Sequence, residues 1–173
     1  MGKTSVNRLT NANVYIDGVS LLGKAEEVSL PDIKHKMAEH KALGMVGTVE
    51  LFAGIDKMEA KIKWNAIYKD VVAKAGNPFQ SVNLQVRGSL ESYASAGRTS
   101  QVPYVVYLTC TFKNAPTGNF KQHDNVELES QLNVTYCKQE IDGEVMMELD
   151  VLANIYKVDG ADLLQTYRAN IGG

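Results

Sequence analysis

Apolar and polar residues alternate strictly in the last third of the chain. Over residues 126–136 the apolar side chains all occupy even positions, and polar side chains fill the odd ones. The turn sequence Ile141-Asp142-Gly143-Glu144 follows, and alternation resumes over residues 145–155. Period-2 alternation predicts strands with one buried face, and Asp-Gly between two such runs is the strongest short-range hairpin signal. The pattern predicts a hairpin with arms of about eleven residues each, against about five or six in a usual strand.

A hairpin of this length exposes long strand edges. Each edge presents a row of unpaired backbone N–H and C=O groups, which pair with another chain unless the protein covers them. We therefore interpret the hairpin as a strand pair that is built for assembly.

The rest of the chain predicts more strands and two short helices. Strands are expected at residues 13–16, 19–22, 28–30, 58–65, 82–90 and 104–112, with a polar loop over residues 93–100. Residues 33–40 fit either a strand or a helix, and residues 42–48 read as a loop. Helical spacing of apolar residues predicts helices over residues 66–75 and 161–169. Seven or eight strands with two helices indicate a mainly β (α+β) fold, an antiparallel β-barrel or sandwich with one flanking helix and a short C-terminal helix.

Composition limits the classes of protein that remain. A chain of 173 residues is expected to form a single domain, residues 1–173, without needing a metal or disulfide to hold its core. The net charge of −2 argues against a dedicated nucleic-acid binder, which needs a clustered basic face. No apolar run approaches the ~18 residues of a membrane span, so we expect no stable membrane association.

The two cysteines are far apart in the sequence and have no companion metal ligands. Cys110 alternates with Leu108 and Phe112, which favours a position in the core. The polar N-terminus lacks the apolar stretch of a signal peptide, so we expect both thiols to be reduced. A disulfide to Cys137 stays open, because adjacent strands could bring the two residues together.

Candidate catalytic chemistry is sparse. The triplet Gly2-Lys3-Thr4 lacks the strand and glycines of a phosphate-binding loop. The spacing of His35, His40 and His123 fits no metal site. The carboxylates Glu127, Glu129, Glu144, Glu148 and Asp150 could suggest paired acid–base residues, but they equally form the polar face of a half-solvated sheet. We expect no catalytic residue, no metal and no cofactor.

Two groups of segments resemble a known family. The first comprises residues 13–20 (NVYIDGVS), Gly23, residues 29–36 (SLPDIKHK) and residues 41–45 (KALGM); the second comprises residues 157–164 (KVDGADLL) and 168–172 (RANIG). Together they resemble the major tail tube proteins of contractile-tailed bacteriophages and the tube proteins of R-type pyocins. The resemblance spans essentially the whole chain, and its specific part lies in these end segments.

The resemblance implies a structural subunit of the inner tube of a contractile tail. Subunits of that family form hexameric rings whose strands combine into one inner barrel, and the rings stack into a hollow tube. The implied partners are other copies of the chain, the tail sheath protein, the baseplate or initiator and terminator proteins, and the tape measure protein. DNA passes through the channel, or nothing does in a bacteriocin. The implied location is the virion tail, with assembly in the cytoplasm of the host bacterium.

Three groups of residues are then candidates for assembly. Apolar side chains on a glycine-flanked loop need a cover, and such a loop comprises Leu43, Gly44, Met45, Val46 and Gly47. The resemblance implies that this loop reaches the adjacent ring. Strand alternation places a polar face with Glu127, Glu129, Glu144 and Glu148 toward the channel. The C-terminal segment is expected to dock through Leu163, Leu164, Tyr167 and Ile171.

Two alternatives remain open on the sequence. A type VI secretion tube protein would form similar rings but serve secretion. A small β-barrel enzyme or ligand-binding protein would instead use the carboxylate face.

Overall fold

The computed structural model describes residues 4–173 and shows a mainly antiparallel β protein. The triplet Gly2-Lys3-Thr4 falls largely outside the described residues. The strands are β1 Val6–Ile16, β2 Val19–Ser20, β3 Ala25–Ser29, β4 His35–His40, β5 Val49–Ile55, β6 Met58–Trp64, β7 Val82–Ala94, β8 Gly97–Phe112, β9 Leu128–Ile141, β10 Glu144–Asp150, β11 Ile155–Val158 and β12 Ala161–Asp162. The helices are α1 Lys69–Ala75 and α2 Gln165–Asn170.

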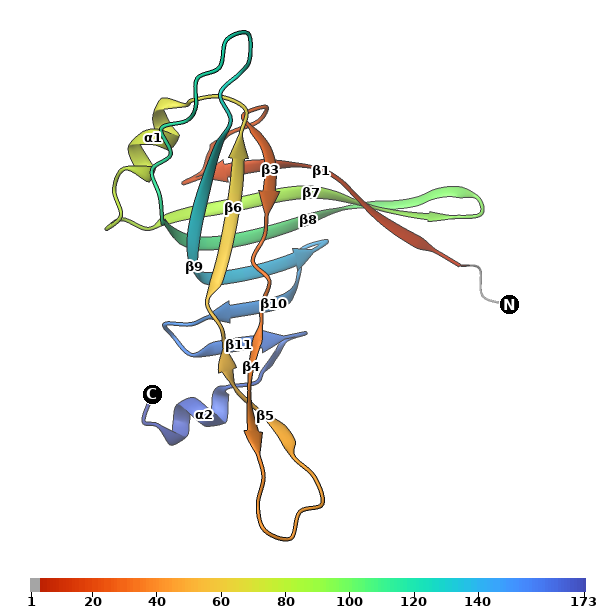
Figure 1. The fold of residues 1–173 in the computed structure, drawn as a ribbon. Coiled ribbons are helices and arrows are strands. Elements are labelled where there is room, and N and C mark those ends of the chain that lie inside the picture. The colour runs from red at the N-terminus through yellow and green to blue at the C-terminus, as the bar shows by residue number, and fades with distance from the viewer. Residues whose placement is uncertain (1–3) are drawn as a thin grey trace.

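The strands form two layers that cross each other (Figure 1). The main sheet has the order β12-β11-β10-β9-β8-β7-β1-β2. The second layer consists of β3, β6 and the first half of β9, so that β9 belongs to both layers. Strands β4 and β5 form a separate two-stranded ribbon. This architecture confirms the predicted fold class.

The hydrophobic core lies between the two layers. Alternation sends Met58, Ile62 and Trp64 of β6 inward, and their exposed fractions are 1% or less. Leu84, Val106 and Leu132 meet them from the strands of the main sheet and from β9. The indole Nε1 of Trp64 donates to the hydroxyl of Ser130 at 2.9 Å, so the polar atoms of both buried residues have partners. The second layer therefore covers one face of the main sheet and leaves the opposite face free.

A bulge changes the orientation of side chains halfway along β9. Thr109 pairs with Tyr136 and Cys110 pairs with Val134, so Thr135 has no partner in the register. Before the bulge the even residues point into the core, whereas Cys137 is buried after it. The predicted alternation through residue 136 is therefore wrong for Tyr136, which shares the free face of the main sheet.

The second arm of the predicted hairpin is also interrupted. Strand β10 ends at Asp150, whose carboxylate accepts the backbone N–H groups of Leu152 and Ala153 at 3.0 Å each. Asn154 then adopts a φ of 53°, which completes a turn into β11. The Asp142-Gly143 turn is confirmed between β9 and β10, but the continuous strand over residues 145–155 is wrong.

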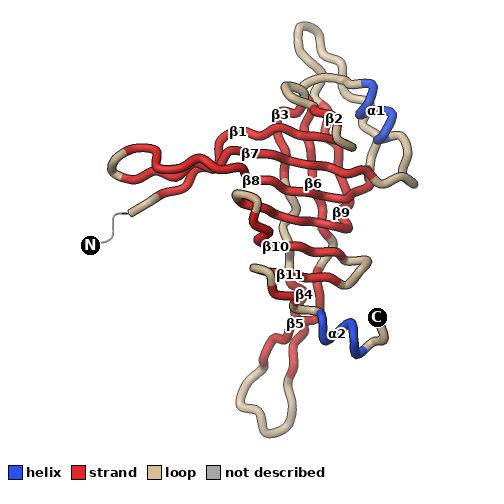
Figure 2. Tube along the Cα trace, turned by 180° about the vertical axis from the view of Figure 1, so that it is seen from behind, coloured by secondary structure: helices blue, strands red, loops and turns tan. Residues whose placement is uncertain are grey.

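The longest hairpin is formed by β7 and β8 instead. Tyr93 pairs with Arg98 and Ala94 with Gly97, so the strands continue through most of the region predicted as a polar loop. That prediction for residues 93–100 is wrong, because polar residues there bond across the strands rather than to water alone. In Figure 2 this hairpin and the start of β1 extend well beyond the second layer.

The remaining predicted elements agree with the structure in kind. Strand β6 and helix α1 confirm the change from strand to helix after Trp64. The ambiguous segment 33–40 forms strand β4, where it pairs with β5. The predicted helix over residues 161–169 is shorter, because Ala161 and Asp162 pair with β11 before α2 begins.

Candidate assembly surfaces

The β4–β5 ribbon projects from one end of the molecule, beyond the β12 edge of the main sheet (Figure 1). Every residue of β4 is exposed, and Met37, Leu51 and Phe52 are about half exposed. In the connecting loop, Leu43 and Val46 are fully exposed and Gly44 has a φ of 86°. A two-stranded ribbon is marginally stable alone in water. Its uncovered apolar side chains indicate a surface that another subunit covers, and this contact stays a prediction.

The base of the ribbon faces the C-terminal helix across an apolar groove. The groove has a volume of about 400 Å³ and is lined by Phe52, Ile55, Leu149, Leu164 and Tyr167, among others. The His35 ring lies 3.1 Å from the Tyr156 hydroxyl and packs edge-on against Phe52. The ribbon is thereby fixed at its base, although its outer half has no contact with the core.

Helix α2 is held by a charged pair rather than by deep burial. The Arg168 guanidinium lies 2.5 Å from the Asp162 carboxylate and also donates to the Asn154 carbonyl at 2.8 Å. Of the predicted docking residues, Leu164 and Tyr167 line the groove, but Tyr167, like Leu163 and Ile171, is more than half exposed. The structure thus brings Leu164 and one side of Tyr167 against the body and leaves Leu163 and Ile171 available to a neighbour.

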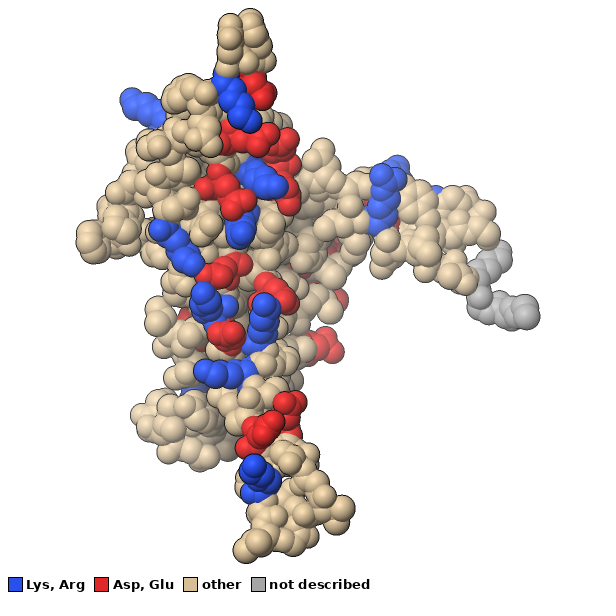
Figure 3. Space-filling view, in the orientation of Figure 1, with Lys and Arg blue, Asp and Glu red and all other residues tan. Residues whose placement is uncertain are grey.

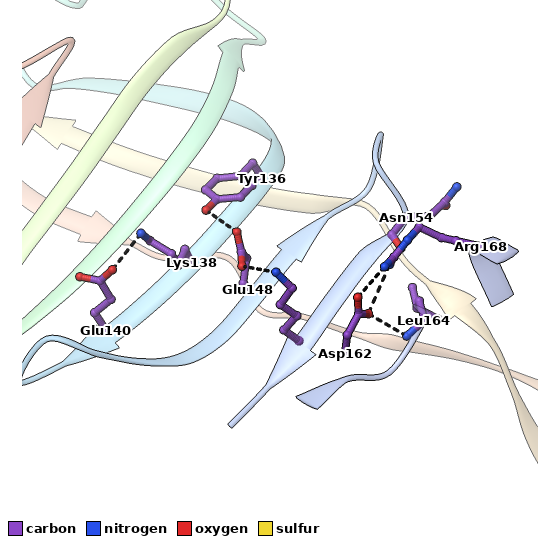
Figure 4. Close-up of polar contacts among 9 residues, drawn as sticks. Tyr136, Lys138, Glu140, Glu148, Asn154, Asp162, Leu164 and Arg168 are labelled. Atoms are coloured by element: carbon purple, nitrogen blue, oxygen red, sulfur yellow. Dashed lines mark hydrogen bonds and ion pairs between the residues drawn. The ribbon is translucent and has the colours of Figure 1, made fainter. Parts of the chain in front are cut away.

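Paired charges cross the free face of the main sheet from β9 to α2 (Figure 4). Lys138 pairs with Glu140 at 2.8 Å, and Lys157 pairs with Glu148 at 3.5 Å. The Tyr136 hydroxyl also donates to Glu148 at 3.0 Å. We call this set the charge ladder: Glu140, Lys138, Glu148, Lys157, Asp162 and Arg168. Each cation of the ladder lies within 4 Å of a carboxylate, so little of its charge is available to a ligand.

The contacts of the charge ladder shift the pKa values of Asp162, Lys138 and the neighbouring Tyr136. The hydrogen bond from Arg168 lowers the pKa of Asp162, and the hydrogen bond to Glu140 raises the pKa of Lys138. Burial, together with the bond to Glu148, raises the pKa of Tyr136 above the ordinary value of a tyrosine. Lys138 also lies 4.4 Å from the centroid of the Tyr107 ring. These directions keep Asp162 and Lys138 ionised and Tyr136 neutral at neutral pH.

A second charged surface covers the outside of the second layer. Figure 3 shows basic and acidic side chains mixed over β3 and β6. Lys63 pairs with Glu27 at 2.9 Å, and Lys61 lies 3.7 Å from Glu129. We call this surface the outer charged face. It lies on the side of the molecule opposite the charge ladder, because the core separates the two layers.

The described residues offer little for other chemistry. Among residues 4–173 there is no group of three His, Cys, Asp or Glu side chains that could hold a metal ion. Cys110 and Cys137 are free and buried, and burial raises the pKa of Cys110 to about 12 and that of Cys137 to about 11. No helix in the described part of the chain is long and apolar enough to span a membrane.

Comparison with known proteins identifies the family of this chain. The family model described as phage tail tube protein FII matches residues 6–172. The chain belongs to the phage tail tube family. Its relatives include the tail tube protein of Escherichia phage P2, which is 28% identical over 171 residues and covers 95% of this chain and 96% of the relative. The major tail tube protein of Serratia phage KSP20 is 28% identical over 152 residues, which are 87% of this chain and 86% of the relative.

A solved structure supports the fold. The tube subunit resembles a chain of the PVC sheath–tube complex of an extracellular contractile injection system in its extended state. The TM-score is 0.55 at 11% identity, over 75% of this chain and 88% of that chain. The protein is a structural subunit of a phage tail tube and a component of the virion tail, as the resemblance in its sequence implied. Because the tail tube family is structural, the enzyme alternative is excluded.

The four carboxylates predicted for the channel of the tube do not share one face. Glu148 belongs to the charge ladder, whereas Glu129 lies on the outer charged face. Glu144 sits exposed at the tip of the β9–β10 hairpin, where it pairs with Ile141, and Glu127 precedes β9. The prediction of a single acidic face is wrong for two physical reasons. Strand β9 passes from one layer to the other, and the Thr135 bulge reverses its alternation.

Most of the ladder was not identified from the sequence of this tube subunit. Lys138, Glu140, Lys157, Asp162 and Arg168 come from three strands and one helix, and only the register of the sheet brings them together. One signal was present, because Lys138 and Glu140 are two residues apart on a strand and therefore share a face. The strand's polar positions also alternate in sign, which is compatible with cross-strand pairs.

Proposed function

We propose that the tail tube subunit closes into hexameric rings that stack into a hollow tube, with the free face of the main sheet lining the channel. The observation that carries this proposal is the asymmetry of the main sheet. One face is covered by the second layer, the other is polar, and among the described residues the sheet ends at β12 and β2 without a further strand. Closure with neighbouring subunits removes such edges and places the uncovered face inside.

The charge ladder suits a channel through which DNA slides. Free lysines and arginines bind phosphates and make binding strong at low salt. Here Lys138, Lys157 and Arg168 already have carboxylate partners, so a phosphate must compete with an ion pair that is present. Arg87 of β7 also lies exposed on this face, without a carboxylate within ion-pair distance among the described residues. Most cations of the channel are thus paired, so the channel is neither uniformly acidic nor strongly basic, and this allows passage without tight binding.

The outer charged face then lies on the outside of the tube, where it contacts the sheath protein. Support comes from its position opposite the ladder and from its mixed charges, which offer polar contacts without a large apolar patch. The tube ends contact the baseplate or initiator and terminator proteins, and the channel holds the tape measure protein before DNA. Assembly takes place in the host cytoplasm, with residues 1–173 acting as one unit.

Thiol labelling tests which face lines the channel. Gln85 lies on the free face of the main sheet, and Gln85→Cys places a thiol there. Lys61→Cys, on the outer charged face, serves as the matched control. A bulky polymer-linked maleimide should label both variants as free subunits but only Lys61→Cys in intact tubes without sheath. The native thiols are expected to stay unreactive because both are buried, which also raises their pKa values. Equal labelling of Gln85→Cys in intact tubes would place this face outside.

Truncation after Asp159 tests the C-terminal segment. It removes the β12 edge, α2, the partly buried Leu164 and the half-exposed Tyr167 in the groove. Contact with a neighbouring subunit would complete their burial, and full burial of such a side chain contributes about 1.5–3 kcal/mol. We expect folded subunits without stable rings in size-exclusion chromatography with light scattering. Gln165→Ala, on the exposed side of α2, should leave rings unchanged. A truncated subunit that still forms normal tubes would refute a docking role for this segment.

A further inference from the structure

Part of the main sheet extends past the second layer as an arm. We define the arm as residues 6–11 of β1, 89–94 of β7 and 97–104 of β8 with their connecting turn. Figures 1 and 2 both show it projecting alone from the body of the subunit. The register continues through the arm, with Leu9 opposite Leu90 and Leu90 opposite Val102. The arm is therefore a regular three-stranded sheet that has no second layer.

Specific contacts shape the base of the arm. A bulge in β1 leaves Asn11 unpaired with a φ of 52°. Its carbonyl oxygen lies 3.2 Å, and the Leu9 side chain 3.0 Å, from where a Cβ of Gly88 would stand. Only glycine permits this close approach of β1 to β7 without displacing the backbone. The departure of the arm from the body is thus built into the sequence.

Polar bonds hold the outer half of the arm together. Glu91 is 7% exposed and accepts from the Tyr93 hydroxyl at 2.7 Å, from Arg98 at 3.0 Å and from Gln101 at 3.3 Å. The hydrogen bonds from Tyr93 and Arg98 lower the pKa of Glu91, so it stays ionised at neutral pH. These groups lie on the free face of the main sheet, which lines the channel in the proposed tube. The other face carries a row of apolar side chains, Leu9, Leu90 and Val102, and Leu9 is 53% exposed.

The direction of the arm identifies what covers that row. Neighbours around a ring join along the order of the strands, from β2 to β12, which is perpendicular to the strands themselves. The arm instead extends along the strands, so in the proposed tube it points toward the adjacent ring. At the opposite end of the same strands lie α1 and the connection from α1 to β7 (Figure 1).

That opposite end offers an apolar acceptor. Phe79 is 96% exposed there, and Leu22 and Val19 are also largely exposed. Beside it a hollow of about 480 Å³ is lined by Ile16, Val19, Leu21 and the side of α1. A surface at one end that fits a different surface at the other generates a head-to-tail contact, which repeats without closing. Such repetition is what stacking of rings requires.

We propose that the arm of one subunit docks its Leu9-Leu90-Val102 row on the α1–β7 end of a subunit in the adjacent ring. This inference rests on the proposed tube. The polar face of the arm then continues the channel lining between rings. The β4–β5 ribbon projects along the order of the strands instead (Figure 1). In the proposed tube it therefore contacts the neighbour within its own ring, rather than the adjacent ring that the sequence resemblance implies.

Paired substitutions test the stacking contact. Leu9→Asp on the arm and Phe79→Asp on the acceptor should each leave rings intact but abolish tubes in electron micrographs. Phe79 is so exposed that its replacement cannot unfold the subunit, which keeps the test valid if Leu9→Asp weakens the arm. Lys61→Asp, on the outer charged face, is the control and should still give tubes. Tubes of normal length from either Leu9→Asp or Phe79→Asp would overturn the inference.

Cross-linking gives an independent measurement. Tubes that carry both Ser100→Cys and Phe79→Cys, treated with a short bis-maleimide, should yield covalent products larger than a hexamer. The pair Ser100→Cys and Lys61→Cys should yield none. Absence of products from the first pair in well-formed tubes would also overturn the inference. Wild-type protein that never forms rings or tubes would instead overturn the proposed function, and the stacking contact with it.

Discussion

The Met45→Asp subunit is expected to fold normally and to remain a monomer. Met45 lies in the loop of the β4–β5 ribbon, beside the fully exposed Leu43 and Val46, and contributes nothing to the core. A substitution at such a position changes the free energy of unfolding by about 0.5 kcal/mol or less. In the proposed ring, however, we expect the new carboxylate to be buried where the ribbon contacts the neighbouring subunit, which costs roughly 2–7 kcal/mol for a polar group without a partner.

Circular dichroism and thermal unfolding should match the wild type, whereas light scattering should show only monomers. Met45→Leu, which keeps the apolar side chain, serves as the control and should assemble. A product consisting of separate rings would place the loop between rings, as the sequence resemblance implied. Normal tubes from Met45→Asp would remove the loop from every contact between subunits.

Local patterns in the sequence were sufficient for those features that depend on neighbouring residues. The Asp142-Gly143 turn, the change from strand to helix after Trp64, and the uncovered loop around Met45 each depend on a few consecutive residues. Their structures follow from turn chemistry, from periodicity and from the absence of nearby partners. The family resemblance indicated the function. The short segments that carry it lie toward both ends of the chain, where the structure also depends on neighbouring residues.

Features that depend on sheet register could not be obtained in the same way. The bulge at Thr135 has no signal in residue type, since threonine is an ordinary strand residue. A sequence interpretation that omits this bulge continues the alternation of β9 and places Glu129 on the same face as Glu148, whereas the two lie on opposite sides of the molecule. The arm was missed for a related reason. Its outer half has no second layer, so its sequence is polar like a loop, although Glu91 and its partners give it regular structure.

The largest effect on subunit stability is expected at the bond between Trp64 and Ser130. Trp64 is 1% exposed at the end of β6, and Ser130 on β9 is completely buried. Trp64→Ala should lower the free energy of unfolding by about 3–5 kcal/mol, because it removes a large apolar side chain and leaves a cavity. For a chain of this size that corresponds to a decrease in Tm of roughly 6–20 °C, at about 2–4 °C per kcal/mol.

The hydrogen bond can be separated from the packing by a double-mutant cycle. Trp64→Phe leaves the Ser130 hydroxyl buried without its partner, which adds about 1–3 kcal/mol to the cost of lost volume. Ser130→Ala alone leaves the indole N–H unpaired, so it should also destabilise the subunit. In the double variant neither polar group remains, and its loss of stability should be smaller than the sum of the two single losses. All four proteins of the cycle are measured by urea unfolding and carry Met45→Asp, which is expected to keep the subunit monomeric. Strictly additive losses would show that the 2.9 Å bond contributes nothing beyond packing.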